Sequence, residues 1–305
     1  MRRILFALIT LVCCVFALAN DPPKRPRIFG IAQVQFFAGD LRASNDFYGK
    51  VLNLMQPTNC EGGCDKLPPP RLFSINGRQM LGISPASPHA PTNRIEEITF
   101  ATDDVPALRR YLEFYKIALS KPQKSADNYL SVMDPEGHRI GFRQWSNSFL
   151  EPQSSSSQGS TALPILIHAG IIVRDRQVED RFYQDVLGFH VYWHGGMKDD
   201  QTDWVDMQVP DGTGWIEYML NVPGNADKHL LGVMNHIALG VPDVRVAAKE
   251  LEAKGMKLSE PPQIGRDGKW QLNLYDPDGT RVELMEFTPV EKPCCSEYTG
   301  PHPKP

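Results

Sequence analysis

Hydrophobic residues alternate with polar or small residues along several short stretches of the chain, which is the pattern of strands with one buried face. Two such stretches in the C-terminal half are marked by these apolar positions: Ile167, Ala169, Ile171 and Ile237, Leu239, Val241. Each stretch ends shortly before an aspartate, Asp175 or Asp243, and aspartate is a favoured helix N-cap. We therefore expect a strand followed directly by a helix at both places.

Helical spacing of apolar residues follows each aspartate. One apolar stripe covers residues 178–187 and ends at Gly188, and the other covers residues 244–251 and is followed by Gly255. Glycine commonly ends a helix because it adopts the left-handed conformation without strain. Strand-like stretches come next: 188–193, 204–209 and 215–220, then 271–275 and 281–287. The unit therefore reads as strand, helix and about three strands, βαβββ.

This unit occurs four times, at roughly 31–84, 94–145, 165–220 and 233–287. The two halves of the chain also match each other. The segment that begins at Asp40 has Phe-Tyr and Val-Leu pairs at the same distances as the segment that begins at Asp175. Each half closes on a similar turn, Asp-Pro-Glu-Gly in the first and Asp-Pro-Asp-Gly in the second. Such a repeat predicts an α+β chain of two similar domains, each a pair of βαβββ units.

Composition supports a folded, water-soluble protein with two domains. Of the 305 residues 41% are hydrophobic and 22% charged, and the net charge of -4 without a basic run excludes a typical nucleic-acid binder. A serine-rich stretch, 147–162, predicts a flexible linker. It separates an N-terminal domain, 29–146, from a C-terminal domain, 163–288. The proline-rich tail, 289–305, is expected to lack regular structure.

The N-terminus has the pattern of a secretory signal. Two arginines precede an apolar run over residues 4–19, which is too short for a comfortable membrane span and ends in Ala-Leu-Ala, a small-x-small cleavage pattern. We therefore predict a signal peptide, residues 1–19, and an exported protein, periplasmic or extracellular, with no membrane contact after cleavage. The alternatives are an uncleaved anchor and a lipid anchor at Cys13 or Cys14.

Cleavage would leave four cysteines: Cys60, Cys64, Cys294 and Cys295. An even number in an oxidising compartment allows disulfides. Cys60 and Cys64 flank a flexible Glu-Gly-Gly and could close a small loop or bind metal. The pattern assigns no role to the adjacent pair in the tail.

The paired units resemble the vicinal oxygen chelate (VOC) superfamily, which includes glyoxalase I, methylmalonyl-CoA epimerase, extradiol dioxygenases and antibiotic-resistance proteins. The motifs that carry the resemblance are a histidine seven residues before an aspartate, the following Phe-Tyr and Val-Leu pairs, and Asp-Pro-Asp-Gly-x-x-x-Glu near the end. The resemblance covers nearly all of the chain beyond residue 28. It implies two tandem VOC domains, each a cupped mixed sheet, with metal ligands on the first and last strands of each unit.

In the second half the resemblance places four metal ligands: His168, Glu217, His236 and Glu283. Strand parity agrees, because the apolar residues around His168, His236 and Glu283 fall on the opposite face of each strand. Imidazole and carboxylate together suit one divalent metal, Zn, Ni, Fe or Mn. The neighbouring Gly170 is small, as is the alanine after Ile237, and both are expected to leave room for a ligand.

The first half lacks this set. Gln33 takes the place of His168, Glu97 that of His236 and Gly141 that of Glu283, while the counterpart of Glu217 falls near Leu81 or Gly82. Half a site rarely holds a metal. We therefore interpret the first domain as structural, as a lid, or as a partner that replaces the second subunit of shorter relatives, which makes a monomer plausible.

The leading function implied by the resemblance is a glyoxalase-type lyase or an epimerase. The metal would bind two vicinal oxygens of a small-molecule substrate and, as a Lewis acid, stabilise an enediolate. Glu283 and Glu217 are the candidate catalytic bases that remove the proton next to the carbonyl. Glutathione and CoA substrates are mainly cytosolic, so export leaves the substrate open.

Two other functions are kept. An extradiol-type dioxygenase would bind Fe(II) through His168, His236 and Glu283, although Asn273 stands where that family has a tyrosine and Glu217 would be surplus. A small-molecule binding protein without catalysis usually lacks the metal ligands.

Several further residues could contribute. His190, His194 and His229 are interpreted as surface or loop residues. For Trp215 and Tyr218, lining a pocket and packing are equally good interpretations. Arg266 and Lys269 lie in a glycine-containing loop, where solvated charges are the usual reading.

Overall fold

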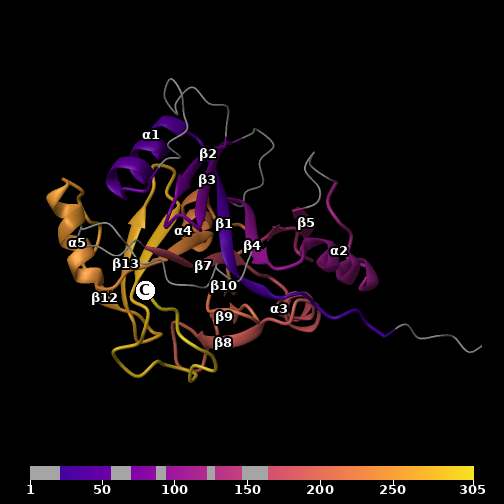
Figure 1. Ribbon diagram of the computed structural model, residues 1–305. Helices are drawn as coiled ribbons and strands as arrows, with labels where there is room; N and C mark the ends of the chain where they lie inside the picture. The colour runs from indigo at the N-terminus through magenta and orange to yellow at the C-terminus, as the bar shows by residue number, and fades with distance from the viewer. Residues whose placement is uncertain (1–20, 56–69, 87–93, 122–127, 146–163) are drawn as a thin grey trace, which may run out of the picture.

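A computed structural model describes residues 21–55, 70–86, 94–121, 128–145 and 164–305 (Figure 1). The predicted signal peptide and serine-rich linker, and Cys60 and Cys64, lie outside these residues. Within them, no helix is both long enough and apolar enough to cross a membrane.

The N-terminal half forms a six-stranded mixed sheet. Its strands, in the order β2-β3-β1-β4-β6-β5, are parallel between β1 and β3 and between β4 and β6, and antiparallel between β1 and β4. The strands are β1 (Ile28–Ala38), β2 (Arg71–Ser74), β3 (Met80–Pro85), β4 (Ile95–Thr102), β5 (Tyr129–Met133) and β6 (Arg139–Gln144). The helices are α1 (Leu41–Asp46), continued by the π-helical η1 (Phe47–Val51), and α2 (Val105–Phe114).

The C-terminal half forms an eight-stranded sheet in the order β12-β13-β14-β11-β7-β10-β9-β8. The strands are β7 (Ile165–Ile172), β8 (His190–Gly195), β9 (Trp204–Gln208), β10 (Trp215–Met219), β11 (His236–Gly240), β12 (Gln263–Ile264), β13 (Trp270–Tyr275) and β14 (Arg281–Met285). The helices are α3 (Arg176–Asp180), continued by the π-helical η4 (Arg181–Val186), α4 (Lys228–Met234) and α5 (Val244–Ala253).

The fold confirms the α+β prediction of two curled mixed sheets built from tandem units. In the second half three strands follow α3 and α5, as predicted. In the first half, among the described residues, two strands follow each helix, and isolated bridges, Met55 with Ser74 and Leu119 with Val132, extend the pairing. The short helix α4 was not predicted.

The predicted caps begin the helices. The side chains of Asp175 and Asp243 accept hydrogen bonds from backbone N–H groups of the first turn, and Gly188 and Gly255 have positive φ just beyond the helical segments. The helix after Asp175 widens into a π-helical turn that contains the Phe-Tyr pair. Both aromatic rings of that pair are buried.

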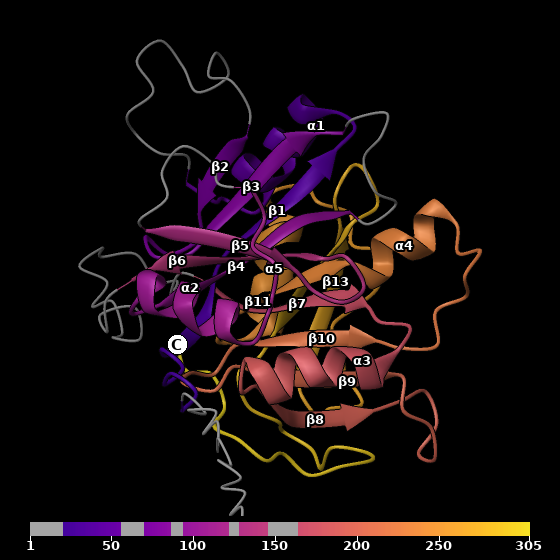
Figure 2. The same ribbon diagram turned by 90° about the vertical axis from the view of Figure 1, so that its right-hand side faces the viewer.

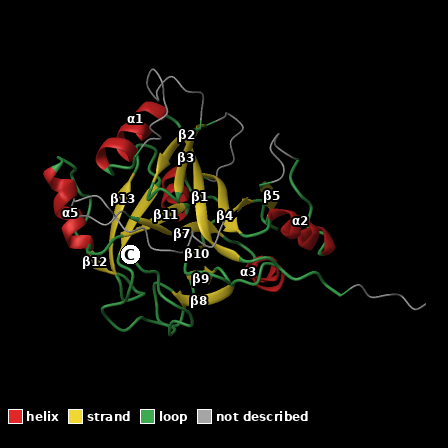
Figure 3. Cartoon of the chain, viewed as in Figure 1, coloured by secondary structure: helices red, strands yellow, loops and turns green. Residues whose placement is uncertain are grey.

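The two halves share one hydrophobic core and are joined by a reciprocal contact. The Tyr48 hydroxyl donates to Asp276 at 3.0 Å, and the Tyr183 hydroxyl donates to Asp134 at 3.0 Å. Each half therefore holds the closing turn of the other. Helices α1 and α5 consequently lie on one side of the sheets and α2 and α3 on the other (Figures 2 and 3).

The C-terminal tail lacks helix and strand, as expected, but it packs along β8. Thr299 N donates to the Tyr192 carbonyl at 3.0 Å, and the Trp193 indole donates to the Cys294 carbonyl at 3.1 Å. Cys294 and Cys295 form a disulfide. His190 and His194, which we placed at the surface or in loops, lie on β8 and are half-buried. His229 is exposed and lies in α4.

Candidate metal centre

The four predicted ligands lie on four strands, β7, β10, β11 and β14, that form the middle of the second sheet. Gly170 of β7 pairs with Glu217 on one side and with His236 on the other. Ala238 of β11 likewise pairs with both His168 and Glu283. Because paired residues share a face and alternate residues along a strand also share it, all four ligand side chains project from one face of the sheet.

Three of the four side chains, those of His168, Glu217 and His236, place ligand atoms within 4.8 Å of one another, and Glu283 lies beside the two histidines. Nε2 of His168 lies 3.1 Å from Nε2 of His236. Glu217 Oε2 lies 3.0 Å from His236 Nε2 and 3.8 Å from His168 Nε2. Glu283 Oε2 lies 3.7 Å and 3.9 Å from the same two nitrogens. Two imidazole nitrogens and two carboxylate oxygens at these separations are a donor set suited to a divalent metal.

Gly170 makes this convergence possible. A Cβ on this residue would lie 2.0 Å from Cε1 of His236, so the imidazole ring occupies the space above the glycine. The expectation that Gly170 leaves room for a ligand was therefore wrong. The room is taken by a candidate metal ligand.

Burial sets the charge of the site. It lowers the pKa of His168 and His236 well below the usual value, so both rings are neutral near pH 7. Burial also raises the pKa of Glu283 to about 8, with Arg281 opposing that shift. Nδ1 of His168 is buried without a hydrogen-bond partner in the described part of the chain. Neutral imidazoles beside desolvated carboxylates fit a bound cation, which would compensate the carboxylate charge.

Arg281 is a site residue that the sequence argument missed. Its Nη2 lies 2.6 Å from His236 Nε2 and 3.8 Å from Glu217 Oε2. It precedes Glu283 by two positions on β14, so strand parity already places it on the same face. The sequence therefore indicated the position of Arg281. Of the nearby basic residues, only Arg266 and Lys269 were interpreted, and both were taken as solvated loop charges.

Lys269 is a second such residue, and the solvated-loop interpretation was wrong for it. Its side chain is fully buried, and Nζ lies 4.8–5.3 Å from the ring centroids of Tyr192, Trp215 and Tyr298. Its closest acid is Asp267, at 3.9 Å. Tyr298 belongs to the tail, so a docked C-terminus covers the lysine. Arg266, in contrast, stays partly exposed and pairs with an exposed aspartate.

The two aromatic residues beside Glu217 have different environments. The Trp215 ring lies 5.0 Å from the His168 ring and also contacts Lys269, so it borders the metal centre. Tyr218 belongs to the main core and lies 5.8 Å from the Tyr183 ring. Trp215 therefore lines the site, whereas Tyr218 packs.

In the first half, other side chains occupy the place that corresponds to the candidate metal centre. The register of β1, β3, β4 and β6 aligns Gln33, Gly82, Glu97 and Gly141 with the four ligands of the second half. Glu97 accepts hydrogen bonds from Thr99 and Tyr129, both at 2.6 Å. A Cβ on Gly141 would lie 2.6 Å from Glu97 Oε1, so Glu97 occupies the space of the missing fourth ligand. Glu97 is therefore held by Thr99 and Tyr129, and Gln33 donates to Gln35 at 3.2 Å.

A third group of acids and histidine, Asp134, His138 and Glu179, lies near the junction of the halves. Asp134 accepts hydrogen bonds from His138 and Tyr183, and Glu179 accepts one from the backbone of Glu136 at 2.8 Å. Burial, with Asp134 adding repulsion, raises the pKa of Glu179 to about 8. Glu179 is therefore protonated at pH 7, as expected for a buried carboxyl group beside another acid.

This raised pKa predicts a pH dependence of stability. The folded state keeps the Glu179 proton up to about pH 8, whereas the unfolded chain loses it near pH 4.5. The stabilisation that the protonated Glu179 gives the folded state is therefore full below pH 4.5 and is lost as the pH rises to about 8. Relative to Glu179→Gln, the free energy of unfolding of the wild type should fall by on the order of 4 kcal/mol between pH 4.5 and pH 8. Urea unfolding across this range measures it, and parallel curves for the two proteins would contradict it.

Comparisons with known proteins agree with this architecture. Residues 165–284 match the family model of the Glyoxalase/Bleomycin resistance protein/Dioxygenase superfamily. The chain is 26% identical over 123 residues to lactoylglutathione lyase of Haemophilus influenzae, covering 40% of this chain and 91% of that protein. It is 27% identical over 148 residues to mouse mitochondrial methylmalonyl-CoA epimerase, covering 46% of this chain and 83% of that protein.

Two further comparisons, one with a plant protein and one with a solved structure, differ in how much of each chain they cover. A probable chloroplastic lactoylglutathione lyase of Arabidopsis thaliana is 27% identical over 134 residues, and the chain spans 38% of its length. The solved structure of the 2,3-dioxygenase LapB from Pseudomonas sp. KL28 superimposes with a TM-score of 0.61 at 16% identity, covering 92% of this chain and 94% of that one. The chain therefore has the tandem VOC fold. Residues 165–284 belong to the Glyoxalase/Bleomycin resistance protein/Dioxygenase superfamily.

Proposed function

We propose that the protein is a metal-dependent enzyme that removes a proton next to a carbonyl of a small molecule with two vicinal oxygens. One observation carries the proposal: His168, Glu217 and His236 bring their ligand atoms together in the second half, and the Glu283 carboxylate lies 3.7 Å from His168 Nε2. The same positions in the first half hold two glycines, Gln33, and a Glu97 that already accepts hydrogen bonds from Thr99 and Tyr129. Only the second half, among the described residues, therefore keeps this donor set available.

His168, Glu217, His236 and Glu283 would hold one divalent metal. The bound metal would supply Lewis acidity, which withdraws electron density from the substrate oxygens. The lowered pKa of both histidines keeps their rings neutral at pH 7, and Nε2 of His236 would exchange its contact with Arg281 for the metal. Trp215 packs against His168 and helps to keep water from that side of the site.

Glu283 is the preferred proton acceptor of this chain. Without the metal, burial raises its pKa to about 8; the bound metal would favour the carboxylate form, which as the conjugate base of a weak acid is a strong proton acceptor. Glu217, on the opposite side of the two histidines along the sheet, is the alternative base. The Arg281 guanidinium, which contacts His236, is placed to bind an oxygen that gains negative charge.

The lyase and epimerase named among the relatives support this reaction class, because both names describe chemistry at a carbon next to a carbonyl. The predicted export argues against a glutathione or CoA substrate, because both are mainly cytosolic. We therefore propose the class of reaction and do not assign the group, such as glutathione or CoA, to which the substrate would be attached.

An extradiol-type dioxygenase is the second candidate, with Fe(II) held by His168, His236 and Glu283. Asn273 pairs with Glu283 across β13 and β14, and its amide donates to Glu260 at 2.6 Å. A hydrogen-bonded asparagine therefore stands where that family has a tyrosine. Glu217, only 3.0 Å from His236, would be a surplus carboxylate. Both features favour proton abstraction.

Metal content is the test of this proposal. Plasma mass spectrometry of the mature protein should find about one divalent metal per chain, and His168→Ala and Glu283→Ala should each lose it. Gln33→Ala is the matched control, because Gln33 occupies the equivalent position in the first half and should leave the metal content unchanged.

Each result has a clear consequence. Zn, Ni or Mn at one per chain supports proton abstraction, to be followed by deuterium uptake from solvent into small 2-hydroxy carbonyl compounds. Iron together with oxygen consumption on a catechol would favour the dioxygenase. A wild type that stays metal-free after reloading contradicts both and leaves a small-molecule binding protein.

A further inference from the structure

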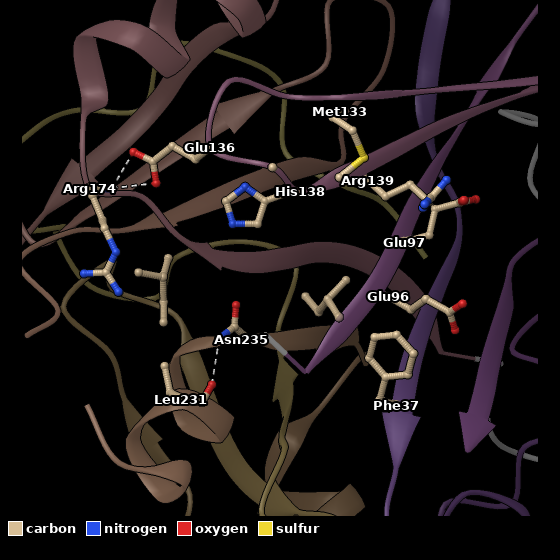
Figure 4. Close-up of a pocket in the computed structure, with 13 residues that line it drawn as sticks. Phe37, Glu96, Glu97, Met133, Glu136, His138, Arg139, Arg174, Leu231 and Asn235 are labelled. Atoms are coloured by element: carbon tan, nitrogen blue, oxygen red, sulfur yellow. Dashed lines mark hydrogen bonds between the residues drawn. The ribbon is translucent and has the colours of Figure 1, made fainter. Parts of the chain in front are cut away.

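A cleft of about 490 Å³ lies where the two halves meet, away from the four candidate metal ligands (Figure 4). Its apolar walls come from both halves, Phe37 and Ile95 from the first and Ile172 and Leu231 from the second. Its volume is within the range of pockets that bind small molecules. The first half contributes residues from the ends of β1 and β4, so the domain that lacks metal ligands still helps to form a recess.

One buried polar group points into this cleft without a partner. The Asn235 side chain is almost fully buried, and its amide nitrogen donates to the Leu231 carbonyl at 2.8 Å. Its Oδ1 has no hydrogen-bond partner among the described residues. Figure 4 shows this oxygen and the His138 ring on the same open space. A buried carbonyl oxygen that lacks a donor is unfavourable, so the geometry calls for an N–H or O–H group from a ligand.

The internal repeat shows what His138 adds to its turn. Asp134 accepts from the backbone of His138 at 2.7 Å, as Asp276 accepts from that of Thr280 at 2.8 Å. Each aspartate also accepts from a tyrosine of the other half. The turn therefore forms with threonine as well as with histidine. What histidine adds is a ring whose Nδ1 is held by Asp134 at 2.7 Å, which leaves Nε2 for the cleft.

Charged groups of both signs line the cleft. Arg174 and Glu136 lie on one side, and Arg139, Glu96 and Glu97 lie on the other (Figure 4). Glu136 accepts from the backbone N–H of Arg174 at 2.9 Å and so anchors that residue. The Arg174 guanidinium makes only a long contact, 3.4 Å, to the Val222 carbonyl. A small recess lined by guanidinium and carboxylate groups is complementary to a molecule that carries both a negative and a positive end.

We propose that this cleft binds a small zwitterion, an amino acid or a short peptide. The carboxylate of the ligand contacts Arg174, and its ammonium group lies toward Glu96 and donates to Asn235 Oδ1. His138 Nε2 accepts a further hydrogen bond. This site is separate from the metal centre and does not depend on the proposed reaction.

Calorimetric titration of the mature protein tests the proposal. The probes are glycine, β-alanine, γ-aminobutyrate and glycylglycine, and acetate and methylammonium serve as controls with a single charge. At least one zwitterion should bind at least tenfold more tightly than either control. Arg174→Met should weaken that binding about tenfold, and because Arg174 is exposed the variant should fold. His138→Thr, which copies the other half of the repeat, should also weaken it.

His168→Ala separates this cleft from the metal centre. Zwitterion binding should persist in His168→Ala, whereas the metal should be lost. The proposal is overturned if zwitterions bind no better than the single-charge controls, or if Arg174→Met and His138→Thr bind like the wild type. Loss of binding in His168→Ala but not in Arg174→Met would place the ligand at the metal centre and would also overturn it.

Discussion

Gly170→Ala is expected to weaken metal binding at least about 100-fold, although it changes none of the four candidate ligands. The added Cβ would lie 2.0 Å from Cε1 and 2.2 Å from Nδ1 of His236, which is closer than real Cβ contacts. Gly170 is fully buried between β10 and β11, so neither strand can move away easily. The imidazole must therefore swing out of the cluster. Disturbing the orientation of a ligand already costs 10–100-fold in affinity, and displacing one costs more.

Metal titration of Gly170→Ala against the wild type measures this effect. Gly224→Ala is the control, because a Cβ there meets nothing within 4 Å. If Gly170→Ala is also unstable, the double variant Gly170→Ala/His236→Ala should recover stability, because it removes the clash. Wild-type metal affinity in Gly170→Ala would show that His236 does not bind where the structure places it.

The repeat explains how much of this site the sequence could reveal. Strand parity and the seven-residue spacing to the capping aspartate placed His168 and His236 on one face, and the register of the second sheet agrees. Strand parity does not predict which neighbouring side chain occupies the space above a small residue such as Gly170. At the position equivalent to Gly170 the first half has Gln35, because there Glu97 replaces the histidine that needs the space.

Other features depend on contacts between distant segments, which a local pattern does not contain. Lys269 is buried because Tyr298, far along the chain, folds back over it. The cleft at the junction follows from how β1 and β4 approach α4, and no periodicity encodes that approach. Among the described residues of the first half, two strands follow each helix where about three were predicted, and isolated bridges occur at Met55 and Leu119.

Lys269→Met is expected to lower the free energy of unfolding by about 3–5 kcal/mol while leaving the metal content near one per chain. Lys269 is the cation nearest to Asp267, and it also opposes the raised pKa of the buried Asp206. Removing one member of a buried charge pair leaves the other uncompensated, which is the costly case. The aromatic rings around Nζ add cation–π attraction that methionine cannot replace.

A double-variant cycle with Asp267→Asn separates this charge effect from packing. Because a neutral amide in place of the Asp267 carboxylate would need no counter-charge, the combined Lys269→Met/Asp267→Asn protein should be destabilised by less than the sum of the single changes, by at least about 1 kcal/mol. Guanidinium unfolding at pH 7 supplies the four free energies. Additive effects would mean that Lys269 stabilises the fold through its rings and methylene groups alone. A loss of metal in Lys269→Met with an intact fold would instead make the lysine part of the metal centre, because its charge lies on the same side of the sheet as Trp215 and His168.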